Sequence, residues 1–588
     1  MRKLYNSLSV ILLITGFSVD YAVAQKDTTK LNQSVEVMKA YSPSISNANK
    51  VNQLPVIDDT TRFTPEFKYS IISQPIKSGF TASPIGAADV NGVRSKDLGL
   101  GYLKLGVGMY NTLYGDFFLN VPKSKIGTFG VHLRHLSSAG QIKLKEGDLV
   151  DAPYSQNNGG LFGSVILGST ILSGELSYDR DAMRYYGYPV ALPANISSIS
   201  FNQYGLSQAY QNGNFIIKLK NSEKTMSDLN FDGGIRLGFF DALTGQKETS
   251  GGLFGKFDYN FDQFHGILNL SYDHFSTDSI HIDSQVLPGT KTEDWIKIAP
   301  SVKLDGDDWS LRGGINFVEV LNRNSGNTTK LYPDFEFNYR PIKEILTLYA
   351  GFKGDLKNNS YGDISSENYW ADPRHNIRNT DYTYMITGGL KGKISHEISY
   401  NIGLKYSQVK DLYFYVQNSF SDLSSDKIPP PEIYNNAFDV VYDNAGIFNL
   451  STEFSYTAGK DLSVVLKGNY YNYSLERLKF ASQMPSFDLT GSANLRIIER
   501  VTGFADLGII GNRKASVYYF DLISNAGPIL KEFSIDPTIR INLGATYDYS
   551  SKLKLFGRVD NLLNRQNEQW LGYTSQGLRI MAGATYSF

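Results

Sequence analysis

Hydrophobic and polar residues alternate with a period of two along most of the chain, from residue 98 to its end. Phe335, Phe337 and Tyr339, for example, alternate with polar side chains, and the same pattern recurs in residues 253–261. Successive side chains of a β-strand point to opposite faces, so each such segment is predicted to be a strand with one apolar and one polar face. Because no helix of three turns is evident after the N-terminal residues, the pattern predicts an all-β fold.

The connections between these strands are alternately short and long. The short ones are residues 122–127, 261–264, 305–308, 340–344, 457–461, 498–500 and 550–551. The long ones are polar and comprise residues 139–158, 188–208, 277–292, 357–380 and 419–435. This alternation is typical of a transmembrane antiparallel up-and-down β-barrel with short periplasmic turns and long extracellular loops. The segments predict about 22 strands, and an even number places both ends of the barrel on the periplasmic side.

A soluble all-β repeat protein is the main alternative fold. It would have connections of similar length on both sides and a fixed repeat period, and the chain shows neither. The composition also favours the barrel, since 39 Tyr and 34 Phe accompany a mean hydropathy of only −0.26. In a membrane barrel the apolar face contacts lipid and aromatic side chains form girdles at the interfaces.

The first residues have the pattern of a secretory signal peptide. Arg2 and Lys3 precede an apolar run at residues 8–17, and Ala-Val-Ala at 22–24 predicts cleavage before Gln25. An N-terminal membrane anchor is the alternative, although the run is short for a spanning helix. The predicted organisation is a signal peptide (1–24), an N-terminal segment (25–97) and an outer-membrane barrel (98–588). The middle segment is predicted to be irregular and periplasmic or lumenal, because it is weakly periodic and contains five scattered prolines: Pro43, Pro55, Pro65, Pro75 and Pro84.

Charge and cysteine content exclude several functions. The net charge is −1, so no general basic surface is available for nucleic acid. The chain has no Cys, which excludes disulfides, thiolate metal sites, a Cys nucleophile and a lipoprotein anchor.

No catalytic or metal motif stands out, and we expect no enzymatic activity and no cofactor. Residues 396–400 begin like a zinc-protease helix, but Tyr400 occupies the place of the second His, in a predicted tight turn. His132 and His135 are expected on opposite faces of one strand. A lipase-type barrel stays an alternative, because its Ser and His need no shared motif. A cation site is a further alternative in the polar loop that contains Asp278, His281 and Asp283.

The C-terminal residues carry the most specific resemblance. Residues 559–564 (Val-Asp-Asn-Leu-Leu-Asn) followed by 577–588 resemble the last hairpin of TonB-dependent-receptor barrels, in which an Asn-Leu element leads to a final strand ending in Phe. Gly583, Tyr586 and Phe588 are similar to the signal read by the barrel-assembly machinery. Leu578, Ile580, Ala582, Ala584, Tyr586 and Phe588 are predicted to form one lipid-facing stripe.

The N-terminal side departs from that family, whose members carry a globular plug inside the barrel. Only residues 25–97 are available here, so the resemblance is to a barrel without a folded plug, of the type found in Bacteroidetes. Within this segment Val35, Glu36, Val37 and Met38 resemble the short extended motif that pairs with the TonB protein. A plain linker is the alternative.

One long loop groups residues suited to ligand recognition: Trp370, Arg374, His375 and Arg378. Function concentrates in such loops. The alternative is that the loops pack over the barrel mouth or against a partner.

Two functions follow from these features. A 22-strand barrel has so wide a lumen that transporters of this size keep it plugged. We therefore favour an accessory or scaffold subunit of a larger outer-membrane complex, for assembly or transport, or an occluded channel. The alternative is a TonB-coupled receptor or transporter for an extracellular solute. The expected partners are outer-membrane lipids, the barrel-assembly machinery, and TonB, other outer-membrane proteins or surface lipoproteins.

Overall fold

The computed structural model describes residues 100–588 with gaps. The residues it leaves out in this range are 122–126, 146, 148, 188–206, 222–228, 262–263, 279–280, 283–284, 287–290, 323–325, 373–376, 419–436 and 520–528. Residues 1–99, which include the predicted signal peptide, the N-terminal segment and the TonB-like motif at 35–38, lie outside the described part.

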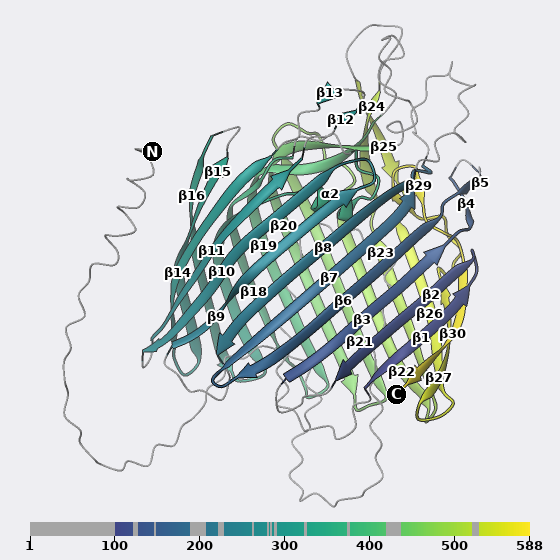
Figure 1. Ribbon diagram of the computed structural model, residues 1–588, viewed down its shortest axis with the longest axis horizontal. Helices are drawn as coiled ribbons and strands as arrows, with labels where there is room; N and C mark the ends of the chain where they lie inside the picture. Colours follow the sequence, from purple (N-terminus) through teal and green to yellow (C-terminus); the bar gives the residue numbers. More distant parts are fainter. Residues whose placement is uncertain are drawn as a thin grey trace, which may run out of the picture. The chain divides into compact units, whose positions relative to one another are not determined.

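In the part of the chain that the structure describes, twenty-two antiparallel strands form a closed barrel (Figure 1). The first eleven are β1 (Gly101–Gly108), β2 (Thr112–Val121), β3 (Gly127–Ser138), β6 (Tyr154–Leu167), β7 (Thr170–Arg184), β8 (Ser207–Asn221), β9 (Leu229–Ala242), β10 (Lys247–Phe261), β11 (Phe264–Thr277), β14 (Thr292–Asp305) and β15 (Trp309–Asn322). The others are β16 (Thr328–Ile342), β17 (Leu346–Lys357), β18 (Thr380–Lys393), β19 (Ile398–Asn418), β20 (Phe438–Ala458), β21 (Leu462–Leu475), β22 (Phe487–Ile498), β23 (Val501–Ile510), β26 (Thr538–Asp548), β27 (Leu553–Asp560) and β30 (Arg579–Ser587). Each strand pairs with the next, and β1 pairs with β30 to close the barrel, with Leu103 opposite Tyr586. The predicted fold class and strand number are confirmed.

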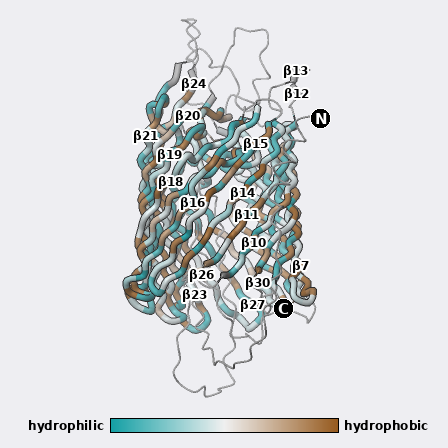
Figure 2. The backbone as a smooth tube through the Cα atoms, turned by 90° about the vertical axis from the view of Figure 1, so that its left-hand side faces the viewer, coloured by the Kyte–Doolittle hydropathy of each residue, from teal (hydrophilic) through white to brown (hydrophobic). Residues whose placement is uncertain are grey.

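The apolar faces of the strands form the outer surface of the barrel, and the polar faces line its interior. Phe335, Phe337 and Tyr339 of β16 are all exposed on the outer surface, whereas Asp334 faces inward and accepts a hydrogen bond at 2.6 Å from the guanidinium of Arg312 on β15. Figure 2 shows apolar and polar positions alternating along the strands. A closed barrel with an apolar outer face leaves no backbone group unpaired in lipid, so the chain is an outer-membrane protein.

The connections differ in length at the two ends of the barrel. Residues 306–308, 343–345, 394–397 and 499–500 are tight turns at one end, which we assign as periplasmic. The longest connections lie at the opposite, extracellular end and contain α2 (Tyr361–Glu367), β4 (Gln141–Lys143), β5 (Leu149–Asp151), β12 (His281–Ile282), β13 (Gln285–Val286), β24 (Arg513–Tyr519), β25 (Ile529–Ile535), β28 (Glu568–Trp570) and β29 (Tyr573–Thr574). In the described part of the chain, no helix is long and apolar enough to cross a membrane.

The C-terminus lies at the periplasmic end, beside the start of β1 (Figure 1). The Phe588 backbone N–H donates to the Gly101 carbonyl at 3.1 Å, and the Gly101 N–H donates to the Phe588 carbonyl at 3.3 Å. The last strand presents Ile580 and Tyr586 outward, both exposed, while Arg579 and Thr585 are buried on the inner side. The face pattern predicted for this strand therefore agrees with the structure.

Candidate functional site: the closed extracellular end

Helix α2 lies at the extracellular end and is held by its N-terminus (Figure 1). The Ser360 hydroxyl accepts a hydrogen bond from the Asp363 N–H at 2.9 Å, and the Asp363 carboxylate accepts one from the Ser360 N–H, which forms a capping box. Glu248 also accepts hydrogen bonds from the Tyr361 and Gly362 N–H groups at 2.7 and 2.9 Å. A carboxylate is favoured there because these N–H groups have no partner within the helix and the helix dipole is positive at this end.

The Glu248 contact crosses part of the barrel opening. Glu248 belongs to β10, whereas α2 connects β17 to β18, and β11, β14, β15 and β16 lie between β10 and β17 in the wall. Beyond the helix, the Tyr210 hydroxyl of β8 donates to the Tyr369 carbonyl at 2.8 Å. These contacts hold the β17–β18 connection away from its own strands and against the part of the wall formed by β8–β10.

An aromatic cluster packs against α2. Trp370 stacks on Tyr573 with ring centroids 4.0 Å apart, and Trp570 packs edge-on against Tyr415 at 4.7 Å. Such pairs stabilise a fold beyond the apolar area that they bury. The cluster is almost fully inaccessible to water and contains Tyr185, Ile364, Trp370, Ala371, Tyr413, Tyr415, Ala437, Phe438, Val440, Trp570 and Tyr573.

The cluster spans the opening of the barrel. Tyr185 directly follows β7 and Tyr415 lies near the end of β19. Nine strands separate β7 from β19 in one direction around the barrel and eleven in the other, so the two strands stand on nearly opposite sides. Since Tyr185 and Tyr415 belong to one buried cluster, side chains from opposite walls meet across the mouth.

The β28–β29 hairpin completes the closure from a third side, within the β27–β30 connection. The buried guanidinium of Arg513 donates to the carbonyls of Glu568 and Gln569 at 2.5 Å each. Gln417, at the end of β19, donates to the Leu571 carbonyl at 3.3 Å. Backbone carbonyls of the hairpin are thereby bound by side chains from two other extracellular segments.

We call this assembly the cap and define it as residues 360–372 and 567–575 together with Tyr185 and Tyr186. The Tyr186 hydroxyl links two of its parts by donating to the Thr574 carbonyl at 2.9 Å. The cap is a packed structure of in-folded loops, which agrees with the alternative that the extracellular loops pack over the mouth.

Glu367, at the end of α2, is a carboxyl group that contacts the aromatic cluster of the cap. One carboxylate oxygen accepts a hydrogen bond from the Tyr413 hydroxyl at 2.6 Å, and the other is buried without a partner. Burial raises the pKa of Glu367 to about 7, against the opposing effects of the Tyr413 hydrogen bond and of Lys357. Beside it lies a cavity of about 10 Å³, the size of one water position, which the unpartnered Asn359 Oδ1 and Tyr473 hydroxyl also border.

We predict that closure of the cap depends on pH through Glu367. An exposed carboxyl titrates near 4.5, so between that pH and about 7 the closed cap holds a proton that an opened cap releases. Closure is therefore most favourable below pH 4.5 and loses up to about 3 kcal/mol as the pH rises through 7. Hydrogen exchange of the β28–β29 amides should accelerate between about pH 5 and pH 8, after correction for intrinsic rates. Glu367→Gln should flatten this dependence, while Glu499→Gln, in an exposed periplasmic turn, should leave it intact; an unchanged profile in Glu367→Gln would contradict the assignment.

The chain is similar to known proteins in its fold and not in its sequence. No protein-family model matches the chain, and no curated protein sequence matches it. The FrpB iron transporter from Neisseria meningitidis (F5-1 variant) superposes with a TM-score of 0.61 at 11% sequence identity, over 84% of this chain and 83% of FrpB. The pyoverdine outer membrane receptor FpvA from Pseudomonas aeruginosa PAO1 gives a TM-score of 0.60 at 13% identity, over 83% and 78%. The chain has the fold of an outer-membrane receptor barrel. The copper transporter OprC gives 0.59 at 11% identity, over 84% and 80%.

The receptor-like barrel places the predicted loop residues in different environments. Trp370 is buried in the cap, and its indole N–H donates to the Arg184 carbonyl at 3.1 Å, so it packs the closure rather than projecting toward solvent. Arg378 is exposed, with Asp411 at 3.3 Å. Arg374 and His375 lie outside the described residues. A recognition role for this group stays a prediction, with Arg378 as its exposed described member.

The histidines follow the strand pattern. His132 faces the lumen, 3.3 Å from Asp116, and His135 faces outward, 2.7 Å from Asn157, so the expectation of opposite faces is confirmed. Among the described residues, no group of three or more His, Asp or Glu is placed to bind a metal ion. Asp283, from the polar loop considered as a cation site, lies outside them.

The residues proposed as an assembly signal lie where the barrel closes. A Cβ at Gly583 would come within 2.0 Å of the Leu105 carbonyl oxygen, so only glycine fits. The Phe588 ring stacks on Phe117 at 6.3 Å. Recognition of Gly583, Tyr586 and Phe588 by the assembly machinery stays a prediction.

The residues that hold the cap together, chiefly Glu248, Glu367 and Arg513, were not predicted from the sequence. Charged residues near strand ends are common in barrels, and nothing local marks these three. Trp570 and Tyr573 carried the best available signal, because two large aromatic side chains in an extracellular connection suggest burial.

Proposed function

We propose that this protein is an occluded receptor-like barrel that acts as an accessory or scaffold subunit of a larger outer-membrane complex. The observation that carries the proposal is the cap: packed side chains from opposite walls close the extracellular end. A solute receptor needs an accessible binding surface at that end, whereas a scaffold needs a stable closed one.

The alternative is a TonB-coupled receptor or transporter for an extracellular solute. It is favoured by the fold, since FrpB and OprC are transporters and FpvA is a receptor. It is also favoured by the resemblance of Val35, Glu36, Val37 and Met38 to a TonB-pairing motif. The cap would then be a gate that opens when a ligand binds.

Purification of the tagged protein from native outer membrane separates the two functions. We expect stoichiometric co-purification of other outer-membrane proteins, with the barrel-assembly machinery the leading candidate, and unchanged solute uptake in a strain that lacks the chain. Co-purification of TonB and a surface lipoprotein alone, with lost energy-dependent uptake, would favour the alternative. Val37→Pro refines this test, because proline removes a backbone donor that strand pairing with TonB needs. Uptake lost in Val37→Pro while the barrel stays intact would count against the scaffold role.

A further inference from the structure

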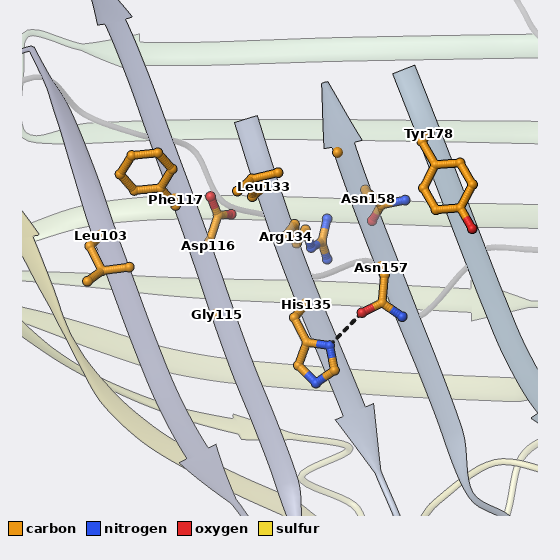
Figure 3. Close-up of a pocket in the computed structure, with 11 residues that line it drawn as sticks. Leu103, Gly115, Asp116, Phe117, Leu133, Arg134, His135, Asn157, Asn158 and Tyr178 are labelled. Atoms are coloured by element: carbon orange, nitrogen blue, oxygen red, sulfur yellow. Dashed lines mark hydrogen bonds between the residues drawn. The ribbon is translucent and has the colours of Figure 1, made fainter. Parts of the chain in front are cut away.

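A hollow of about 400 Å³ lies in the outer surface of the barrel, over β1, β2, β3, β6 and β7 (Figure 3). One row of paired residues runs across these strands: Leu103 opposite Phe117, Phe117 opposite Leu133, Leu133 opposite Gly159, and Gly159 opposite Tyr178. Leu103 and Leu133 are exposed, which shows that the row faces out of the barrel. The hollow therefore opens toward the membrane.

Two glycines deepen the hollow without being required by the backbone. A Cβ at Gly115 would meet only the Leu105 side chain at 3.7 Å, and a Cβ at Gly159 would meet the Leu133 side chain at 3.4 Å. Both are ordinary contact distances, and neither glycine has a positive φ. Larger residues would fit at both positions, and they would fill the space that the glycines leave open.

The extracellular end of the hollow is polar. His135 and Asn157 stand one outward row above Leu133 and Gly159, and their side chains are hydrogen-bonded at 2.7 Å. The Asn157 amide also donates to the Ser155 hydroxyl at 3.1 Å. These bonds lower the cost of placing polar groups on a membrane-facing wall. The Asn157 amide retains hydrogen-bonding capacity, because a carboxamide has two N–H donors and two lone pairs on its oxygen.

We infer that this hollow is a binding site for an outer-leaflet lipid. One acyl chain lies along Leu103, Phe117 and Leu133, and the ester, amide or hydroxyl groups at the head of the chain contact Asn157. Two features support this occupant: the hollow is continuous with the lipid-contacting surface, and it changes from apolar to polar toward the extracellular side as a lipid does. Concave apolar surfaces with a few placed polar groups are typical of small-ligand sites. The inference rests on the membrane-facing wall and not on the scaffold function.

Photo-crosslinking in vesicles tests the inference. The full-length protein is reconstituted in phosphatidylethanolamine–phosphatidylglycerol vesicles that contain a trace of phosphatidylethanolamine with a diazirine in one acyl chain. Crosslinked peptides are identified by mass spectrometry. We expect crosslinks to concentrate on peptides that carry Leu103, Phe117, Leu133 and Gly159, above the average for the wall. Even labelling around the barrel would overturn the inference, because it would show only the ordinary lipid shell.

Filling the hollow provides the matched comparison. Gly159→Leu should lower crosslinking in the hollow about tenfold, which corresponds to lost contact with about two methylene groups. Gly557→Leu, at an outward glycine on β27 with no atom within 4 Å of its Cβ, should leave it unchanged. Heat-modifiable migration verifies folding, and Gly115→Leu serves if Gly159→Leu does not fold. Undiminished labelling in a folded filled variant would overturn the site. Replacement of lipid crosslinks by crosslinks to a second protein chain in native membranes would also overturn it, because a protein partner would then occupy the hollow.

Discussion

Replacing Trp570 and Tyr573 with alanine should open the extracellular end of the barrel. Both side chains are buried in the cap, and truncation of a buried large aromatic residue costs about 3–5 kcal/mol. That cost exceeds what a small loop assembly can lose while staying packed. Removing residues 25–97 alone should leave the barrel non-conducting, because the cap remains. The cap variant combined with this deletion should conduct ions steadily in planar bilayers and should sensitise cells to large antibiotics.

Conductance is measured for all four combinations of an intact or altered cap with an intact or deleted N-terminal segment. The comparison separates the contribution of the cap to closure of the lumen from that of the segment. Trp309→Ala removes an exposed aromatic side chain outside the cap and serves as the control, with no expected conductance. Steady conductance from the deletion alone would show that the segment, and not the cap, closes the lumen. Absence of conductance in the combined variant, once folding is verified, would show that a partner or another part of the chain fills it.

Phe588→Asp should reduce the amount of assembled barrel by about tenfold or more. A charge on the lipid face close to the interface costs only about 0–1 kcal/mol, which is too little to unfold a barrel of this size. A large loss must then come from failed recognition by the assembly machinery or from the lost ring contact with Phe117, since the backbone bonds to Gly101 do not depend on the side chain. Ser587→Asp, one residue away and on the opposite face, is the comparison. The heat-modifiable fraction in isolated outer membranes measures both, and equal levels would remove Phe588 from the proposed signal.

The barrel could be predicted from the sequence because a few neighbouring residues are enough to assign the outward face of each strand. Phe335, Phe337 and Tyr339 assign an outward face within five residues, and the final strand repeats the same pattern with Ile580 and Tyr586. Membrane barrels require this alternation in every strand, so each segment repeats the same evidence.

The cap could not be predicted, because its contacts are not local. Trp370 stacks on Tyr573, about two hundred residues later, and Glu248 binds the N-terminus of a helix that begins at Tyr361. Such pairings depend on which strands face each other across the barrel, which follows only from the closed structure. The hollow around Gly159 was missed for a related reason: Gly115 on β2 and Gly159 on β6 are brought together only by the strand register.

The position of the β28–β29 hairpin in the chain also bears on when the mouth of the barrel closes during folding. The hairpin lies between β27 and β30, the two strands that complete the ring before it closes on β1, and it supplies Trp570 and Tyr573 to the cap. Contacts between residues far apart in sequence form late in folding, since the intervening chain must first be ordered. We therefore expect the cap to pack only after the strands that carry its parts have paired in the barrel wall. A barrel whose strands have not all paired would then lack the cap and leave its extracellular end open.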